Sequence, residues 1–316
     1  MLRRRSTMIN ENIKTKDALE EFYQDKRSEN IAESTLKTYD MHIRNFIDSN
    51  DMWDFTTSLI NKDQYQWWIE DLKEDQNKKD VTVATYCRSV RAFIYWLQEQ
   101  EYCDIFPVKI PKYQKTIKRC YTQEELQILL EKPDRDCSEV QYQTWVYINL
   151  LIATGLRLSS SLNILVKDID FKNGVVYVDV TKNNQGLALS LNDDVLKILK
   201  KYIQLFHLSA DDYLFSIASG SRMANHTMQC NVASYNRAHN VEKTSIHLFR
   251  HTFAKNFYMQ TKDVYTLCQV LGHSNISVTE GYLKDLGVSL FADTVYNPQQ
   301  QFTKKDNAPK RRGKLR

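Results

Sequence analysis

The sequence predicts a mainly α-helical protein with one small antiparallel β-sheet, divided into a helical bundle and a mixed α/β domain. Three observations support this fold class. Apolar residues recur at helical spacing four times within the first hundred residues. A basic stretch with two prolines follows. Three short runs typical of β-strands then lie together at 168–191. At 316 residues, the chain is long enough for two domains with separate cores.

The composition excludes several classes of protein. Hydrophobic residues make up 42% of the chain, and no apolar run approaches the roughly 20 residues that a membrane span requires. Basic residues near the start are not followed by an apolar segment, so a secretory signal is not expected. The six cysteines form no CxxC pair, which argues against a zinc ribbon and for reduced thiols in the cytoplasm. The net charge is only +4, so the basic character is local.

The first domain is expected to be a small bundle of four amphipathic helices. Residues 1–14 are polar and should form a flexible leader, so the bundle occupies 15–106. Its helices are predicted, in order, at 17–27, from an N-cap at Ser34 to Ile47, at 62–72 and at 83–98. Arg88 and Arg91 lie away from the apolar face of the last helix, and the aromatic residues are assigned to the core.

A basic linker, 107–120, separates this bundle from a second domain at 121–298. Pro107 and Pro111 disfavour helix there. A capping box at Thr122 begins the first helix of the second domain, and an apolar helix ends at Gly155. The elements expected next are strands at 168–171, 175–180 and 187–191, a helix at 192–206, a short strand at 213–215 and a helix at 228–239.

The remaining part of the second domain carries an unusual group of polar side chains. A helix at 246–258 places His247, Arg250 and His251 on one face, because positions three and four apart lie together. A second helix, 264–271, ends at Gly272, so His273 lies in a turn. A short helix after Ser277 or Thr279 then presents Tyr282. Imidazole, guanidinium and phenol groups on adjoining helices are suited to a phosphate.

These residues closely resemble the signature of the tyrosine recombinase (phage integrase) family. The resembling segments are TGLRLS at 154–159, a lysine at a strand end, HLFRH at 247–251, LGHSNIS at 271–277, and Tyr282, nine residues after His273. The resemblance runs from about residue 15 to residue 296. It implies that the catalytic residues are Arg157, Lys182, His247, Arg250, His273 and Tyr282.

The resemblance also implies how such residues would act. Two arginines hold the phosphate oxygens through their planar forks, and Tyr282 attacks the phosphorus to form a 3′-phosphotyrosine. Lys182, on the β-hairpin, acts as general acid for the departing 5′-hydroxyl, while His247 assists proton removal or binds the phosphate. His273 donates to a phosphoryl oxygen. No metal or nucleotide cofactor is required, because the bond is exchanged.

Partners follow from the same resemblance. The two domains would form a C-shaped clamp around double-stranded DNA with core-type inverted half-sites. The phosphate contacts expected on the bundle and linker are Arg88, Arg91, Lys112, Lys115 and Lys118. A homotetramer, coupled through the segment after Tyr282, would pass through a Holliday junction in the nucleoid, with an accessory protein as a further candidate partner. The basic tail, 299–316, should be disordered and add non-specific DNA affinity.

Two departures and several alternatives accompany this interpretation. Ser160 stands where the family commonly has an acidic residue, and Phe249 stands where it prefers leucine. These departures favour an enzyme that integrates or excises a mobile element over an Xer-like chromosome-dimer resolvase. A type IB topoisomerase and a DNA-binding protein without catalysis rank lower. The remotest alternative is a zinc hydrolase that uses His247, His251 and His273.

Overall fold

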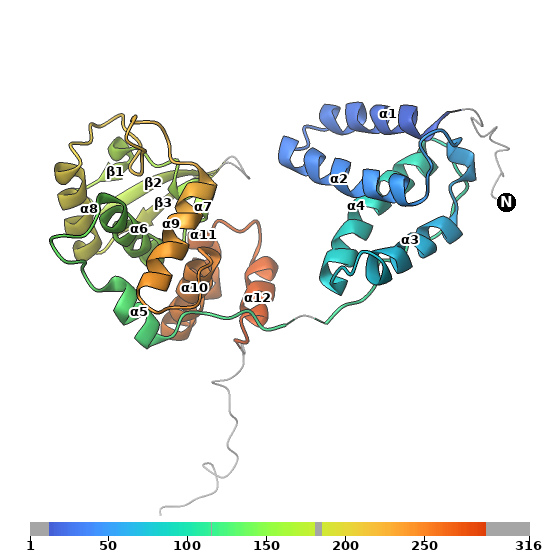
Figure 1. Ribbon diagram of the computed structural model, residues 1–316. Coiled ribbons are helices and arrows are strands. Elements are labelled where there is room, and N and C mark those ends of the chain that lie inside the picture. Colours follow the sequence, from blue (N-terminus) through green and yellow to red (C-terminus); the bar gives the residue numbers. More distant parts are fainter. Residues whose placement is uncertain (1–12, 115, 181–184, 289–316) are drawn as a thin grey trace, which may run out of the picture. The chain divides into compact units, whose positions relative to one another are not determined.

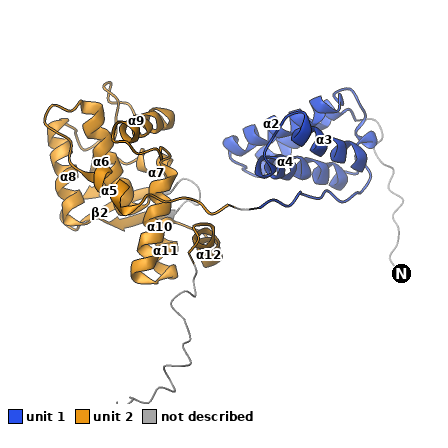
Figure 2. Ribbon diagram, turned by 60° about the horizontal axis from the view of Figure 1, so that its bottom comes forward, with its two compact units in different colours: residues 1–115 blue, residues 116–316 orange. Residues whose placement is uncertain are grey.

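The computed structural model describes residues 13–114, 116–180 and 185–288, and it divides into two compact units between residues 115 and 116 (Figures 1 and 2). This division falls inside the stretch predicted to be a linker. The described residues are mainly helical with one three-stranded antiparallel sheet, which confirms this part of the predicted fold class. None of the helices in these described ranges combines the length and the apolar character needed to cross a membrane.

The first unit is a bundle of helices around an aromatic core. Its helices are α1 (Thr15–Ser28), α2 (Glu33–Ser49), α3 (Lys62–Glu74) and α4 (Asp80–Glu99), with a 3-10 turn at Thr57–Leu59. The rings of Phe22, Phe46, Trp68 and Phe93 are fully buried, as the helical spacing of apolar residues predicts.

One helix start in this unit differs from its prediction. The helix α2 begins at Glu33 after an N-cap at Ala32, so Ser34 lies in the first turn and is not the cap. An acidic side chain in the first turn is favourable near the positive end of the helix dipole, and Glu33 fills that position.

The second unit is organised around α6 (Glu139–Thr154), a helix that is apolar on nearly all sides. Four other helices pack against it. They are α5 (Gln123–Leu130), α8 (Asp193–Leu205), α9 (Asn225–Ala238) and α10 (His247–Thr261). Because four helices pack around α6, the position of its C-terminal end is fixed within the unit.

A small antiparallel meander completes this core. It consists of β1 (Ile169–Asp170), β2 (Val175–Val180) and β3 (Gln185–Ser190), in the order β1-β2-β3. Val176 lies opposite Leu189, and both are buried. The predicted strand at 213–215 is wrong, because Tyr213 forms only an isolated bridge with Leu165.

The helices α11 (Val264–Leu271) and α12 (Ile276–Asp285) form a separate apolar cluster with α10. Ala254, Leu267, Leu271 and Leu283 are almost completely buried in it. Packing of Leu283 fixes α12 against its neighbours, so the next residue towards the N-terminus, Tyr282, is held in place.

Candidate active site

Arg250 lies at the centre of the site, on the second turn of α10, and only 7% of it is exposed. Its Nη1 donates to the main-chain oxygen of Gly155 at 2.7 Å, and its Nη2 donates to the main-chain oxygen of Leu271 at 2.8 Å. These carbonyls lie at the carboxyl ends of α6 and α11, where the helix dipole favours a cation. Burial lowers the pKa of Arg250 to about 10, so the side chain remains charged at neutral pH.

The end of α6 is shaped by Gly155, which adopts the left-handed conformation with φ +63°. A Cβ atom at this position would come within 2.3 Å of the Phe253 ring on α10. Glycine therefore permits both the helix end and the close approach of α10. The extended backbone of Arg157 then begins the short helix α7 (Leu158–Ser161). Burial lowers the pKa of this half-buried arginine, and the Tyr282 phenol acts in the opposite direction.

His273 follows Gly272, which ends α11 in the left-handed conformation. The Nη2 atom of Arg250 lies 3.2 Å from Nε2 of His273, and Nδ1 lies 2.8 Å from Oγ1 of Thr279. Because arginine can only donate, Nε2 is the acceptor and Nδ1 carries the proton. Burial, followed by the charges of Arg250 and Arg157, lowers the pKa of His273 to about 4. The neutral imidazole is therefore held in one tautomer.

Tyr282, on α12, lies beside His251 and His273. Its Oη lies 2.6 Å from Nδ1 of His251, with the ring centroids 5.2 Å apart, and its ring centroid lies 5.6 Å from that of His273. Burial raises the pKa of the phenol to about 12, while Arg250 and Arg157 lower it. A phenol beside two guanidinium groups and a neutral imidazole is chemically suited to attack a phosphate.

The segment that leads into this unit contacts the helix of Tyr282. The main-chain N–H of Lys118 donates to the oxygen of Asp285 at 2.8 Å. The Nζ atom of Lys118 lies 3.5 Å from Oδ2 of Asp285 and 5.6 Å from the centroid of the Tyr282 ring. Ile117 packs against Gly287. Residues 117–118 therefore stabilise the position of the C-terminal end of α12 through a hydrogen bond, an ion pair and an apolar contact.

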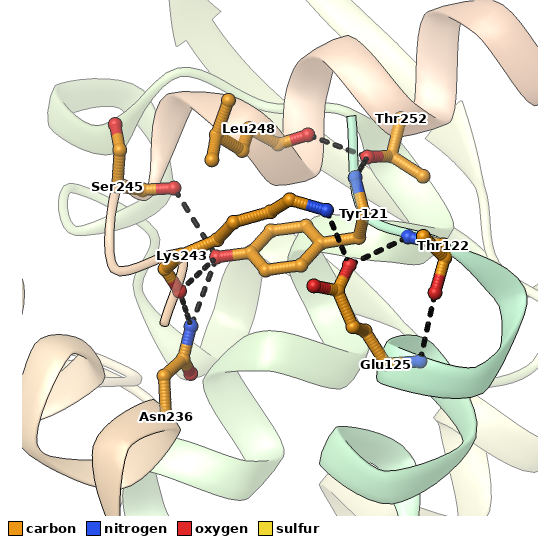
Figure 3. Close-up of polar contacts among 8 residues, drawn as sticks. All are labelled: Tyr121, Thr122, Glu125, Asn236, Lys243, Ser245, Leu248 and Thr252. Atoms are coloured by element: carbon orange, nitrogen blue, oxygen red, sulfur yellow. Dashed lines mark hydrogen bonds and ion pairs between the residues drawn. The ribbon is translucent and has the colours of Figure 1, made fainter. Parts of the chain in front are cut away.

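A buried polar cluster centred on Tyr121 fixes the start of α10 (Figure 3). The main-chain N–H of Tyr121 donates to Thr252 at 2.9 Å, and its ring stacks on Phe249. Its hydroxyl donates to the main-chain oxygen of Lys243 at 3.2 Å and receives a hydrogen bond from Asn236 at 2.9 Å. The turn before α10 is thus tied to the first residue after the linker.

The structure brings together four of the six predicted catalytic residues, namely Arg157, Arg250, His273 and Tyr282. His247 is exposed at the first residue of α10, one turn before His251. Lys182 belongs to the connection between β2 and β3 and lies outside the described residues. Its role therefore stays a prediction.

The predicted DNA contacts are distributed over both units. Arg88 is exposed on α4, where its Nη2 donates to the hydroxyl of Tyr113 at 3.4 Å, and Arg91 is half-buried on the same helix. Lys112 and Lys118 are exposed, and Lys115 lies outside the described residues. Their binding to DNA is untested.

Two residues that contact the site are absent from the predicted catalytic set, although the sequence placed His251 on the same helix face as His247 and Arg250. His251 contacts the Tyr282 hydroxyl, and Thr279 fixes the tautomer of His273. The signal for His251 was present, because it lies one turn after His247 on the same helix face. Thr279 carried no signal, since a buried threonine on a short helix is ordinarily a packing residue.

The histidines of the alternative zinc site are not arranged as metal ligands. His273 presents Nε2 to the Arg250 cation, and His251 presents Nδ1 to a phenol. In the described ranges, no three His, Cys, Asp or Glu side chains are grouped so that they could hold a metal ion. A metal would have to displace Arg250 from His273, which argues against the zinc hydrolase.

The model of the phage integrase family matches residues 119–286, more than half of the chain, and this range includes Arg157, Arg250, His251, His273 and Tyr282. The chain belongs to the phage integrase family. It is thus a tyrosine recombinase by family, as its motifs suggest. It is 29% identical over 258 residues to tyrosine recombinase XerA of Saccharolobus solfataricus, which covers 78% of this chain and 81% of XerA.

Two solved structures of recombinases share the fold of this phage integrase family member. A lambda integrase dimer bound to a COC′ core site gives a TM-score of 0.69 at 15% identity, covering 88% of this chain and 79% of that one. XerH site-specific recombinase bound to difH gives a TM-score of 0.67 at 20% identity, covering 84% of this chain and 79% of the XerH chain. At this level of identity, the likeness concerns the fold alone.

Proposed function

We propose that this protein is a site-specific DNA recombinase that cleaves and rejoins DNA through a 3′-phosphotyrosine at Tyr282. The observation that carries the proposal is the position of the Tyr282 hydroxyl, which contacts His251 while Arg250 and Arg157 influence its pKa. The arginines offer the positive charge that a phosphodiester requires as negative charge builds up on its oxygens. The membership of the phage integrase family supports the same chemistry.

The chemistry divides into an acid, a nucleophile and a phosphate-binding pair. Arg157 and Arg250 hold the non-bridging oxygens, and Arg250 is already fixed by two carbonyl oxygens, so little reorganisation is needed. Lys182 protonates the departing 5′-oxygen. Once the phosphate has drawn Arg250 from Nε2 of His273, its negative charge raises the proton affinity of the imidazole. His273 then takes up a proton from solvent at Nε2 and donates a hydrogen bond to a phosphoryl oxygen. Neither a metal ion nor a nucleotide takes part.

The DNA would be held by both units in a C-shaped clamp. The helical bundle binds one core-type half-site, and the exposed cations Arg88 and Lys112 contact phosphates. Lambda integrase and XerH, which share the fold, were solved on their own DNA sites. Four copies, coupled through the segment after Tyr282, would exchange strands by way of a Holliday junction on inverted half-sites.

A nicked suicide substrate tests the reaction class. The nick lies just downstream of the scissile phosphate, so the short 5′-hydroxyl fragment diffuses away and the protein stays bound to the 3′-phosphate. We expect a denaturant-resistant adduct in the presence of EDTA and without nucleotide. The adduct should disappear in Tyr282→Phe but persist in Tyr265→Phe, a matched control because Tyr265 is exposed on α11.

Each outcome bears on one of the alternatives. An adduct that survives in Tyr282→Phe would move the nucleophile elsewhere. Tight DNA binding without any adduct would favour a DNA-binding protein without catalysis. Relaxation of supercoiled DNA without exchange between two duplexes would favour the topoisomerase.

The biological role is tested with the sites themselves. Inverted repeats at the ends of a mobile element that carries the gene should be recombined if the protein integrates and excises that element. Preferential recombination of a chromosomal site near the replication terminus would favour the Xer-like role.

A further inference from the structure

The Tyr282 hydroxyl contacts a histidine to which the family resemblance assigned no role. Oη lies 2.6 Å from Nδ1 of His251, on the α10 turn that follows His247. We propose that His251 is a further catalytic residue, which accepts the phenol proton as Tyr282 attacks the phosphorus. This inference rests on the proposed function, because it concerns the same attack.

The direction of the hydrogen bond follows from the two groups. A phenol with a raised pKa keeps its proton at neutral pH, and that proton is the donor. Nδ1 of His251 is then the acceptor, with the other nitrogen of the imidazole protonated. His247, the histidine expected to assist proton removal, is exposed at the N-terminal end of the same helix. His251 thus occupies the place that the mechanism requires, in contact with the reacting oxygen.

The charges around His251 keep its acceptor nitrogen available. Burial lowers the pKa of the His251 imidazole to about 4. Lys118, His247 and Arg250 act in the same direction, and Asp285 acts in the opposite one. The imidazole is therefore neutral in the free protein. A DNA phosphate brings negative charge against Lys118 and Arg250, which raises the proton affinity of His251 at the moment when a proton has to be received.

In the proposed cleavage and rejoining steps, each bond that forms replaces one that breaks, and each proton has a named acceptor. The bond from Oη to phosphorus forms as the bond from phosphorus to the 5′-oxygen breaks. The phenol proton passes to Nδ1 of His251, and the 5′-oxygen takes a proton from Lys182. The phenol loses its proton late, because the growing bond to phosphorus lowers its proton affinity. In the rejoining step, the 5′-hydroxyl attacks the phosphorus and returns its proton to Lys182. The bond from phosphorus to Oη breaks, and the protonated His251 returns the proton to Oη as the tyrosine departs.

The test measures the rate of adduct formation from pH 6 to 9 with excess protein over a suicide substrate. A second substrate carries sulfur in place of the bridging 5′-oxygen, and this leaving group needs no proton. The informative variant is His251→Asn, whose amide oxygen reaches about as far as Nδ1 and still accepts a hydrogen bond but takes up no proton. His251→Ala removes the contact altogether. His207→Asn is the control, since His207 is exposed after α8 with φ +51°, a conformation that asparagine tolerates.

We expect His251→Asn and His251→Ala to slow adduct formation about 100-fold or more at pH 7, with DNA binding and circular dichroism unchanged. The rate in His251→Asn should rise about tenfold per pH unit, because the phenolate must form beforehand, while the wild-type rate stays nearly flat. The sulfur substrate should restore Lys182→Ala but leave the His251 variants slow.

Three results would overturn the inference. A wild-type rate in His251→Asn with an unchanged pH profile would reduce His251 to an orienting contact. Full recovery of the His251 variants on the sulfur substrate would assign the histidine to the leaving group. If the wild type forms no adduct, the proposed function fails and the inference fails with it. An adduct that requires Tyr282 but not His251 would leave the proposed function intact.

Discussion

Arg250 donates a hydrogen bond of 2.7 Å to the main-chain oxygen of Gly155, the residue that ends α6. The same guanidinium donates to Leu271, the last residue of α11. The charge that is proposed to bind phosphate therefore also satisfies the ends of two helices. A change at Arg250 should therefore lower both the rate of adduct formation and the free energy of unfolding.

Arg250→Lys tests this double role. An ammonium group keeps the charge but cannot bridge the carbonyl oxygens of Gly155 and Leu271 in the planar geometry of arginine. We expect the free energy of unfolding to fall by about 1–3 kcal/mol, because a buried acceptor is left unsatisfied. Adduct formation should fall at least 100-fold. Urea denaturation and the suicide substrate measure the two effects, and a fully stable but inactive variant would separate the roles.

Gly155→Ala should be strongly destabilising. The new Cβ would come within 2.3 Å of the Phe253 ring, in a backbone conformation that alanine rarely adopts. Gly220→Ala is the matched control, since Gly220 also has a positive φ, +80°, but has no atom within 4 Å of its added Cβ. We expect a loss of about 1–2 kcal/mol for the control. The Gly155 variant should lose about 1–3 kcal/mol more from the clash. Equal losses in thermal or urea unfolding would contradict the role of Phe253.

Thr279→Val should affect rate more than stability. It is nearly isosteric, yet it removes the hydroxyl that holds Nδ1 of His273 at 2.8 Å. The imidazole is then free to change tautomer and orientation. We expect adduct formation to slow about 10-fold, by analogy with groups that orient catalytic histidines. Thr279→Ser keeps the hydroxyl and should retain most of the rate, so a similar loss in both variants would point to packing.

Stability should decrease as the pH falls from about 6.5 to about 4. The pKa values of His251 and His273 are lowered from 6.5 to about 4 in the folded protein. Within that window the unfolded chain binds more protons than the folded chain, so the free energy of unfolding rises with pH. Urea unfolding at pH 7, 6 and 5 measures the slope. His251→Asn should make this slope shallower, and an unchanged slope in that variant would contradict the prediction.

The sequence was sufficient for the elements with strong periodicity. The four helices of the first unit, the apolar helix that ends at Gly155 and the β-meander all appear where apolar spacing and turn residues predict them. Arg250, His273 and Tyr282 meet because each lies at a defined place relative to a helix end, which a local pattern can indicate.

The missed features depend on tertiary contacts. Residues 213–215 are apolar enough for a strand, but the chain around Tyr213 makes only an isolated bridge. The contact between His251 and Tyr282 joins two helices, and no local pattern states which histidine of a pair faces a partner thirty-one residues away. Ser34 was chosen as a cap by its residue type, whereas α2 begins one residue earlier, at Glu33, after an N-cap at Ala32.

The hydrogen bond and ion pair between Lys118 and Asp285 join the beginning of the second unit to α12, its last described helix. Among the described residues of the site, Tyr282 is the last to be synthesised, and its helix is held partly by a segment made before α5. A growing chain on the ribosome would therefore carry the phosphate-binding arginines before it carries the nucleophile. The proposed capacity to cut DNA should therefore arise only when nearly all of this unit has left the ribosome.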